Sequence, residues 1–179
     1  VKSLLADYLP GWIGKIQGRR FMRWGKGDFR FSRPIRWIVS LLDSEVLPIS
    51  ISGCDPEIQI GNISRPHRLH GSTIEIKNSQ NYFDQLLDVG VIVDRDSRLS
   101  CINNLVLSHE INNKFKPDLS EQLLNELTDL VESPLLVAGC FNKSFLDLPP
   151  EVLSTVMKVH QRYIPLYKVN AEFDPLSLH

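Results

Sequence analysis

The stretch "FRFSRPIRWIVSLL", Phe29 to Leu42, alternates between apolar and more polar residues with a period of two. Its odd positions, all apolar but one, are Phe29, Phe31, Arg33, Ile35, Trp37, Val39 and Leu41. Such alternation is typical of a half-buried strand, and Pro34 predicts a sheet edge or a break because proline has no backbone N–H. The stretch therefore predicts that the fold contains a sheet with one buried face.

The same alternation separates the side chains of this stretch into two groups. We expect Phe29, Phe31 and Trp37 to fill a core, with Arg33 on their face as a structural ion-pair residue. Arg30 and Arg36 belong to the opposite face. Those two arginines are therefore the candidates for contact with a partner.

The residues before the strand predict helical turns and a tight turn. Residues 1–9 are expected to be the last turns of a helix that Pro10-Gly11 stops, and residues 12–18 a short helix ending at Gly18. Gly25 and Gly27 mark a turn.

The residues after the strand predict alternating elements. They are a turn at 43–45, a hairpin strand at 46–52, strands at 58–69 and 73–77, a helix between Asn78 or Ser79 and Gly90, a buried strand at 91–94, a helix at 95–114, a helix opened by Asp118 and Glu121, a strand at 134–141, a helix at 151–161 after Pro149-Pro150, and a strand at 162–167. This order predicts an α+β fold with a mixed, largely antiparallel sheet and packed helices.

Length and composition limit the class of protein. The chain has 179 residues, of which 42% are hydrophobic and 23% charged, so one domain over residues 1–179 is expected, with two small lobes as the alternative. The abrupt start and end predict a domain excised from a longer subunit, with residues 170–179 a poorly ordered tail. No apolar run reaches the roughly 18 residues of a membrane span, so no membrane partner is expected. The three cysteines form no CxxC pair, which favours a reducing, cytoplasmic compartment.

Positive charge is concentrated around the opening strand. Met22 to Trp37 carries five basic residues and one acid, whereas the rest of the chain carries fifteen basic and twenty acidic residues. A local excess of this kind suits a polyanion, and Trp24 could stack on an unpaired base if it is exposed. The candidate phosphate contacts are Arg19, Arg20, Arg23, Lys26, Arg30 and Arg36. The alternative is a sheet edge whose arginines pair with acids elsewhere.

Two further motifs offer weaker candidates. "HQRY" places Arg162 at a helix exit, and His160 is expected to be a packed core histidine on the face of Val152. "SRPHRLHG" offers Arg68, together with the spacing of His67 and His70, to RNA or to acid–base chemistry.

Motifs that would identify an autonomous reaction centre are missing. Ser64 and Cys54 lie near His67 in sequence, but no nucleophile-elbow motif accompanies them, and no glycine-rich phosphate loop is present. The sequence predicts no catalytic residue, no metal ligand and no bound cofactor for this chain.

Four segments, taken together, resemble one family. They are "GRRFMRWG" (18–25), "FSRPIRWIVSLLDSEVLPI" (31–49), "VESPLLVAGCF" (131–141) and "FLDLPPEVLSTVMKVHQRYIPLY" (145–167). From about Leu9 to Tyr167 the chain resembles the N-terminal part of the beta subunit of the bacterial-type, heterotetrameric glycyl-tRNA synthetases. It departs from the family pattern at Pro66 and Leu69, where Gly-His-Arg-Phe is usual, and at Ile164, where Phe is usual.

The resemblance implies a function that the residues alone do not. It implies an enzyme that ligates glycine to its tRNA with ATP and magnesium, through a glycyl-adenylate, in an alpha2beta2 assembly whose catalytic core lies in the alpha subunit. It implies a domain related to the editing-type domain of the phenylalanyl-tRNA synthetase beta chain. Glycine is the smallest amino acid, so a size-limited pocket rejects larger ones without a second sieve.

Three roles stay open for this chain. The first is a non-catalytic domain that contacts glycine tRNA and takes part in assembly with the alpha subunit. The second is a docking module that never touches RNA. The third is a vestigial deacylase for mischarged tRNA, with His67 or His160 as the base.

Overall fold

The computed structural model describes residues 1–69, 71–113 and 115–168. Its contacts divide the chain into two compact units, Val1–Val91 (unit 1) and Ile92–His179 (unit 2). The elements of unit 1 are α1 (Lys2–Gly14), β1 (Met22–Arg23), β2 (Arg30–Phe31), β3 (Trp37–Val39), β4 (Leu41–Leu42), β5 (Glu45–Val46), β6 (Gln59–Gly61), β7 (Ile63–Ser64), β8 (Ile74–Glu75), the 3-10 helix η1 (Ser79–Asn81) and α2 (Tyr82–Asp88). The prediction of a single excised domain stays a prediction, and residues 170–179 lie outside the described part.

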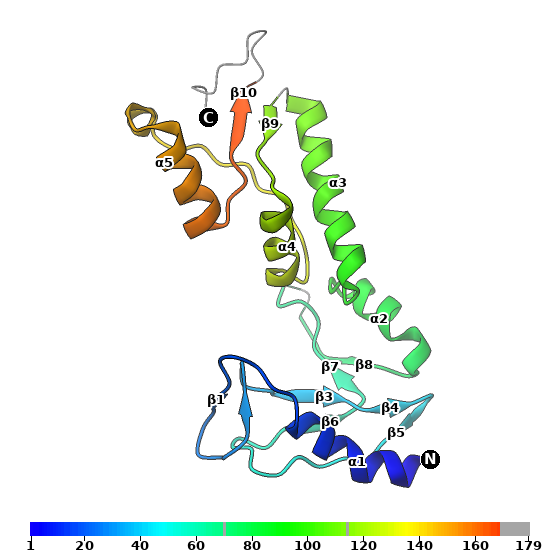
Figure 1. Cartoon of the computed structure of the whole chain (residues 1–179). Coiled ribbons are helices and arrows are strands. Elements are labelled where there is room, and N and C mark those ends of the chain that lie inside the picture. The colour runs from blue at the N-terminus through cyan, green and yellow to red at the C-terminus, as the bar shows by residue number, and fades with distance from the viewer. Residues whose placement is uncertain (70, 114, 169–179) are drawn as a thin grey trace. The chain divides into compact units, whose positions relative to one another are not determined.

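Unit 2 is mainly helical, and its described strands are β9 and β10 (Figure 1). Its elements are α3 (Arg95–Asn113), β9 (Phe115–Pro117), α4 (Glu121–Leu130), the 3-10 helix η2 (Lys143–Asp147), α5 (Pro150–Thr155), the π-helix η3 (Val156–Gln161) and β10 (Leu166–Lys168). β9 and β10 pair antiparallel, although sequence reasoning expected no strand at 115–117. The core of this unit includes Ile102, Val106, Leu123 and Pro165.

The strands form two-stranded pairs, not one continuous sheet, within the described residues. β1–β2, β4–β5, β7–β8 and β9–β10 are antiparallel, and β3–β6 is parallel. The predicted α+β class with mostly antiparallel pairing is therefore confirmed. Ile76 is fully buried in unit 1, where Leu47 and Leu86 are nearly so.

The predicted long strand at 29–42 is broken into β2, β3 and β4. Pro34 lies in the first gap, as expected for a residue without a backbone N–H. The hairpin after it is confirmed, since Leu41 pairs with Val46 and Leu42 with Glu45 across a turn at Asp43. The returning strand is shorter than predicted and ends at Val46.

The predicted stop at Pro10-Gly11 is wrong, because α1 continues through both residues to Gly14. Proline removes only one helical hydrogen bond, at a cost of roughly 3 kcal/mol, so it need not end a helix. The predicted short helix at 12–18 is therefore the last turn of α1. None of the α1 residues is buried.

The predicted strand at 91–94 is also wrong, because Arg98 takes its carbonyl groups. The Arg98 Nη1 atom donates to the carbonyl oxygens of Ile92 at 2.8 Å and Val93 at 2.7 Å, and its Nε to that of Thr128 at 3.1 Å. A guanidinium thus replaces the neighbouring strand. The backbone N–H of Ile92 donates to Glu132.

The predicted strand at 134–141 is absent as well. Its residues form neither helix nor turn and belong to no ladder among the described strands. Figure 1 draws this yellow segment, after α4, as plain coil.

The helices that follow start signals are confirmed, with one shift of cap. Asn78 accepts from the N–H of Gln80 and opens η1 and α2, and Gly90 follows α2 with φ of +79°. α4 is capped by Ser120, whose Oγ accepts from the N–H of Leu123, and not by Asp118. Asp118 instead binds Lys158, with 2.6 Å between Oδ2 and Nζ.

Candidate nucleic-acid interface

The basic stretch of unit 1 folds into a two-stranded antiparallel hairpin. β1 and β2 pair Met22 with Phe31 and Arg23 with Arg30, and a turn at residues 25–27 joins them. Arg23 and Arg30 therefore lie opposite each other across the strands. Like charges placed in this way repel and destabilise a strand pair. An external anion between them would relieve that repulsion.

The turn is held against a second loop by two glycines. The N–H of Phe29 donates to Gly53 at 2.9 Å, and the N–H of Lys26 to Asp55 Oδ2 at 3.1 Å. Gly25 has φ of +66°, and a Cβ there would clash with the Asp55 carbonyl oxygen. A Cβ on Gly27 would likewise clash with the carbonyl of Gly53. The close backbone approach therefore requires glycine at both positions and fixes where Lys26 projects.

Aromatic side chains anchor the hairpin from its other face. The ring centroids of Phe21 and Phe31 lie 5.0 Å apart, and those of Phe29 and Phe31 6.4 Å apart. Trp24 is half-buried, and its Nε1 donates to the Phe31 carbonyl oxygen at 3.0 Å. Trp24 therefore stabilises the hairpin, and it is not exposed as stacking on an unpaired base would require.

The alternation predicted from the sequence is present in the side-chain burial. Phe29, Phe31, Ile35 and Trp37 are half-buried, whereas the even-numbered positions between them are exposed. Arg33 is the exception, and its prediction as a structural ion-pair residue is wrong. It is exposed and forms no ion pair with any residue that the structure describes. Pro34 beside it breaks the strand, so the period no longer points Arg33 inward.

The candidate phosphate contacts in this region are all exposed. They are Arg19, Arg20, Arg23, Lys26, Arg30, Arg36 and Arg68. Only Arg23 has an ion pair among the described residues, with 3.4 Å between Nη1 and Asp28 Oδ1. Both partners are exposed, so that pair contributes little. The structure thus leaves a set of unneutralised cations on one hairpin and the segments next to it.

One arginine at this region was missed by sequence reasoning. The guanidinium carbon of Arg65 lies 5.1 Å from the centroid of the Trp37 ring, a cation–π contact. The backbone of the neighbouring Arg36 is fixed through its carbonyl oxygen, which accepts from the N–H of Gln59 at 3.2 Å. The basic motif at 64–71 was the available signal for Arg65, but nothing in the sequence linked it to Trp37.

The candidates outside the hairpin have different surroundings. Arg162 has φ of +58° and pairs with Glu126, with 2.5 Å between Nε and Oε2, so a phosphate would have to displace Glu126. His160 is exposed, and its prediction as a packed core histidine is wrong. η3 is a π-helix, whose i→i+5 bonding turns later side chains away from the face that α-helical spacing predicts.

The loop with the two histidines offers no assembled reaction centre. His70 lies outside the described residues, so its pairing with His67 is not tested. Ser64 is buried, and burial raises the pKa of the Cys54 thiol. A raised pKa lowers the thiolate fraction and so weakens a nucleophile.

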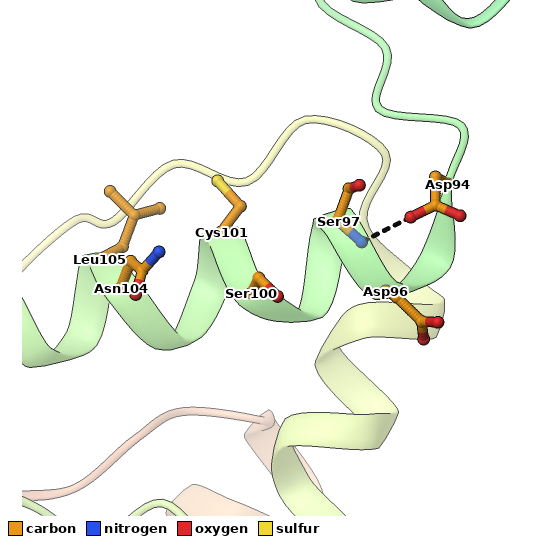
Figure 2. Close-up of a pocket in the computed structure, with 7 residues that line it drawn as sticks. All are labelled: Asp94, Asp96, Ser97, Ser100, Cys101, Asn104 and Leu105. Carbon is orange, nitrogen blue, oxygen red and sulfur yellow. Dashed lines mark hydrogen bonds between the residues drawn. The ribbon is translucent and has the colours of Figure 1, made fainter.

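A shallow depression at the start of α3 has a structural explanation (Figure 2). The Asp94 Oδ2 atom accepts from the N–H of Ser97 at 2.7 Å and so caps the helix. Hydrogen bonds from the Ser97 side chain and N–H, with the nearby charge of Arg98, hold the pKa of Asp94 below its usual range. In Figure 2 Ser100 and Cys101 follow along the helix without converging on a shared point.

Neither a metal-binding cluster nor a membrane-spanning helix is found among the described residues. No three His, Cys, Asp or Glu side chains gather as a metal site within 1–69, 71–113 and 115–168. Across those same ranges, no helix is long and apolar enough to cross a bilayer.

Comparison with known proteins finds matches along nearly the whole chain. The family model described as "Glycyl-tRNA synthetase beta subunit" matches residues 1–176. A glycine–tRNA ligase beta subunit of Trichodesmium erythraeum is 42% identical over 177 residues, which is 98% of this chain and 25% of that protein. Those of Acaryochloris marina and Bacillus subtilis are 44% identical over 165 residues and 37% over 174. They cover 92% and 97% of this chain, and 23% and 25% of their own lengths. The chain thus spans about a quarter of the length of these relatives.

Proposed function

The chain belongs to the glycyl-tRNA synthetase beta-subunit family, and from that premise we propose that it contacts tRNA and takes part in assembly of the enzyme. The observation that carries the proposal is the hairpin of unit 1. Arg23 and Arg30 face each other there, and Arg30 has no partner among the described residues. Phosphates along an RNA backbone supply the missing negative charge.

The proposal assigns graded roles to the basic side chains. The main phosphate contacts are Arg19, Arg20, Arg23, Lys26, Arg30 and Arg36. Arg68 is a weaker contact, and Arg162 is the weakest because Glu126 already neutralises it. Arg33 joins the main group because it is exposed beside Arg36.

The complete enzyme, in this proposal, ligates glycine to its tRNA in the cytoplasm with ATP and magnesium. The alpha subunit carries the catalytic core in an alpha2beta2 assembly, and this chain supplies no catalytic residue. A relationship to the editing-type domain of the phenylalanyl-tRNA synthetase beta chain belongs to the same proposal. The raised pKa of Cys54 and the burial of Ser64 weigh against a working deacylase.

A purely structural docking role is the second candidate, and α1 favours it. Leu4, Tyr8 and Trp12 recur every four residues along this helix and are more than half exposed, and the rings of Tyr8 and Trp12 stack at 6.3 Å. An apolar stripe on a helix with no buried residue suits a protein partner. Loss of assembly with unchanged tRNA affinity per assembled enzyme would select this role.

Charge reversal at the hairpin tests the tRNA contact. Arg30→Glu with Arg36→Glu, made in the assembled enzyme, is expected to weaken tRNA binding at least about tenfold, since each reversal replaces attraction to phosphate by repulsion. Binding is measured by filter retention at fixed salt.

The control for this test changes the same net charge elsewhere. Lys77→Glu with Lys143→Glu alters two exposed lysines outside the hairpin and should leave affinity within about twofold. Equal affinities of the hairpin variant and the unchanged enzyme would remove Arg30 and Arg36 from the proposed interface.

A further inference from the structure

Unit 2 contains an open apolar groove that its own side chains do not fill. The groove has a volume of about 1060 Å³ and lies among α3, α4, α5 and η3, with residues 134–141 along it. Ile102, Leu127, Phe145 and Met157 are among the residues that line it. Among the described residues that line it, the basic ones are His109 and Arg162, none is acidic, and Glu126 pairs with Arg162. A charged partner such as RNA therefore gains little here.

The segment along the groove, Pro134–Phe141, exposes apolar side chains. Leu135 is 81% exposed and Val137 78% exposed, although both belong to the apolar run "PLLVAGCF". A folded protein rarely leaves such a run uncovered unless a partner binds it. The segment is a short, continuous apolar run, which is why a strand was expected there.

The backbone groups of this segment lack hydrogen-bond partners among the described residues, just as its side chains lack cover. None of residues 134–141 forms a hydrogen bond, through main chain or side chain, with another described residue. A backbone whose N–H and C=O groups are unpaired can accept an added strand. Strand addition beside 134–141 would cover the groove and satisfy these backbone groups together.

The length of the relatives leaves room for a segment that could supply the added strand. The chain spans 25% of the Trichodesmium erythraeum beta subunit, so three quarters of such a subunit lie outside the matched region. A strand tethered in the same polypeptide by a short flexible linker acts at an effective concentration of about millimolar, which favours it over a separate chain at lower concentration. We propose that the groove of unit 2 receives an extended apolar strand from the remaining three quarters of the beta subunit, paired with residues 134–141. This inference deepens the assembly part of the proposed function and rests on it.

Amide hydrogen exchange in two forms of the protein tests the proposal. The first form is this 179-residue chain. The second is the complete beta subunit, with this sequence in its matched region, assembled with alpha. The amides of 135–141 should exchange rapidly in the first and at least about a hundredfold more slowly in the second. Equally rapid exchange in both would overturn the proposal. If the amides of 135–141 already exchange slowly in the short chain, and more slowly as its concentration rises, a second copy of the chain covers the segment and the proposal is overturned.

A matched pair of substitutions separates strand addition from unrelated stabilisation. Leu135→Lys in the complete enzyme places a charge in the groove and should restore rapid exchange over 135–141. Leu130→Lys is the control, because Leu130 is 63% exposed on α4 and does not line the groove. Protection that survives Leu135→Lys would contradict the assignment.

The outcome is independent of the tRNA contact. The exchange of 135–141 does not depend on Arg30 or Arg36, which belong to unit 1. Failure of the hairpin substitutions to change tRNA binding would leave the groove proposal standing, and loss of the groove proposal would leave the hairpin proposal standing.

Discussion

The arginines of the two units have opposite surroundings. In unit 2 all three are held: Arg95 by Asp129, Arg98 by backbone carbonyls, and Arg162 by Glu126. In unit 1 the side chains of six of eight form no ion pair, hydrogen bond or cation–π contact with a described residue, namely those of Arg19, Arg20, Arg30, Arg33, Arg36 and Arg68. The difference separates arginines that build the fold from arginines that are available to a partner. Composition alone cannot make that distinction.

The largest expected effect is the loss of Arg98. Arg98→Met leaves three carbonyl groups near the start of α3 and the end of α4 without their donor. Hydrogen bonds from a charged group are strong and unsatisfied carbonyls are costly, so the free energy of unfolding should fall by roughly 3 kcal/mol. Urea unfolding of the chain measures it.

Arg33→Met is the matched control in unit 1. Arg33 is exposed and unpaired, so its loss should change the free energy of unfolding by at most about 0.5 kcal/mol. Equal effects of the two substitutions would break the comparison between held and available arginines.

The turn of the basic hairpin gives the next largest effect. In Gly27→Ala the new methyl group meets the backbone of Gly53 and Asp55, which cannot move as a flexible side chain can. The free energy of unfolding should fall by roughly 2 kcal/mol, as for an overpacked site. Gly61→Ala is the control, since no atom lies within 4 Å of the Cβ it would add. A smaller loss for Gly27 than for Gly61 would contradict the proposed packing of the turn.

The smallest expected effect is the acid sensitivity of the Arg95–Asp129 pair. A hydrogen bond from Arg95 lowers the pKa of Asp129 in the folded chain, and the charges of Arg95 and Arg98 act in the same direction. The carboxylate therefore contributes stability above its unfolded pKa, and this contribution disappears as the pH falls through the lower folded pKa.

The pH dependence of unfolding tests this pair directly. Asp129→Asn should flatten the loss of stability on the acid side of that range and leave the pH dependence near neutrality unchanged. If the loss of stability at acid pH is the same in Asp129→Asn as in the unchanged chain, the Arg95–Asp129 pair does not contribute to the acid sensitivity of folding.

Local signals in the sequence predicted much of the hairpin region. The period-two pattern correctly assigned Phe29, Phe31 and Trp37 to the inner face and Arg30 and Arg36 to the exposed one. Gly25 and Gly27 correctly marked the turn, because positive φ and close backbone approach are local demands on residue type. The prediction that Arg33 lies on the inner face was wrong because Pro34 interrupts the strand.

The remaining errors concern partners distant in sequence. Residues 91–94 and 134–141 are both short apolar runs, but a strand also requires a neighbour. Arg98 takes the carbonyl groups of the first segment, and the second has no neighbour among the described residues. Neither outcome can be predicted from the residues of the two segments alone. The strand at 115–117 was missed because it forms only through its pairing with β10, which lies about fifty residues away in the sequence.

The salt dependence of tRNA binding tests the central claim most directly. Arg30→Gln with Arg36→Gln in the assembled enzyme removes two phosphate contacts, and Arg95→Gln with Lys143→Gln removes two cations of unit 2. The slope of log affinity against log salt should become shallower by about 1.4 to 1.8 for the first pair, because two fewer phosphates are neutralised and fewer counterions are released on binding. The slope should be unchanged for the second pair. An unchanged slope for Arg30→Gln with Arg36→Gln would contradict the account.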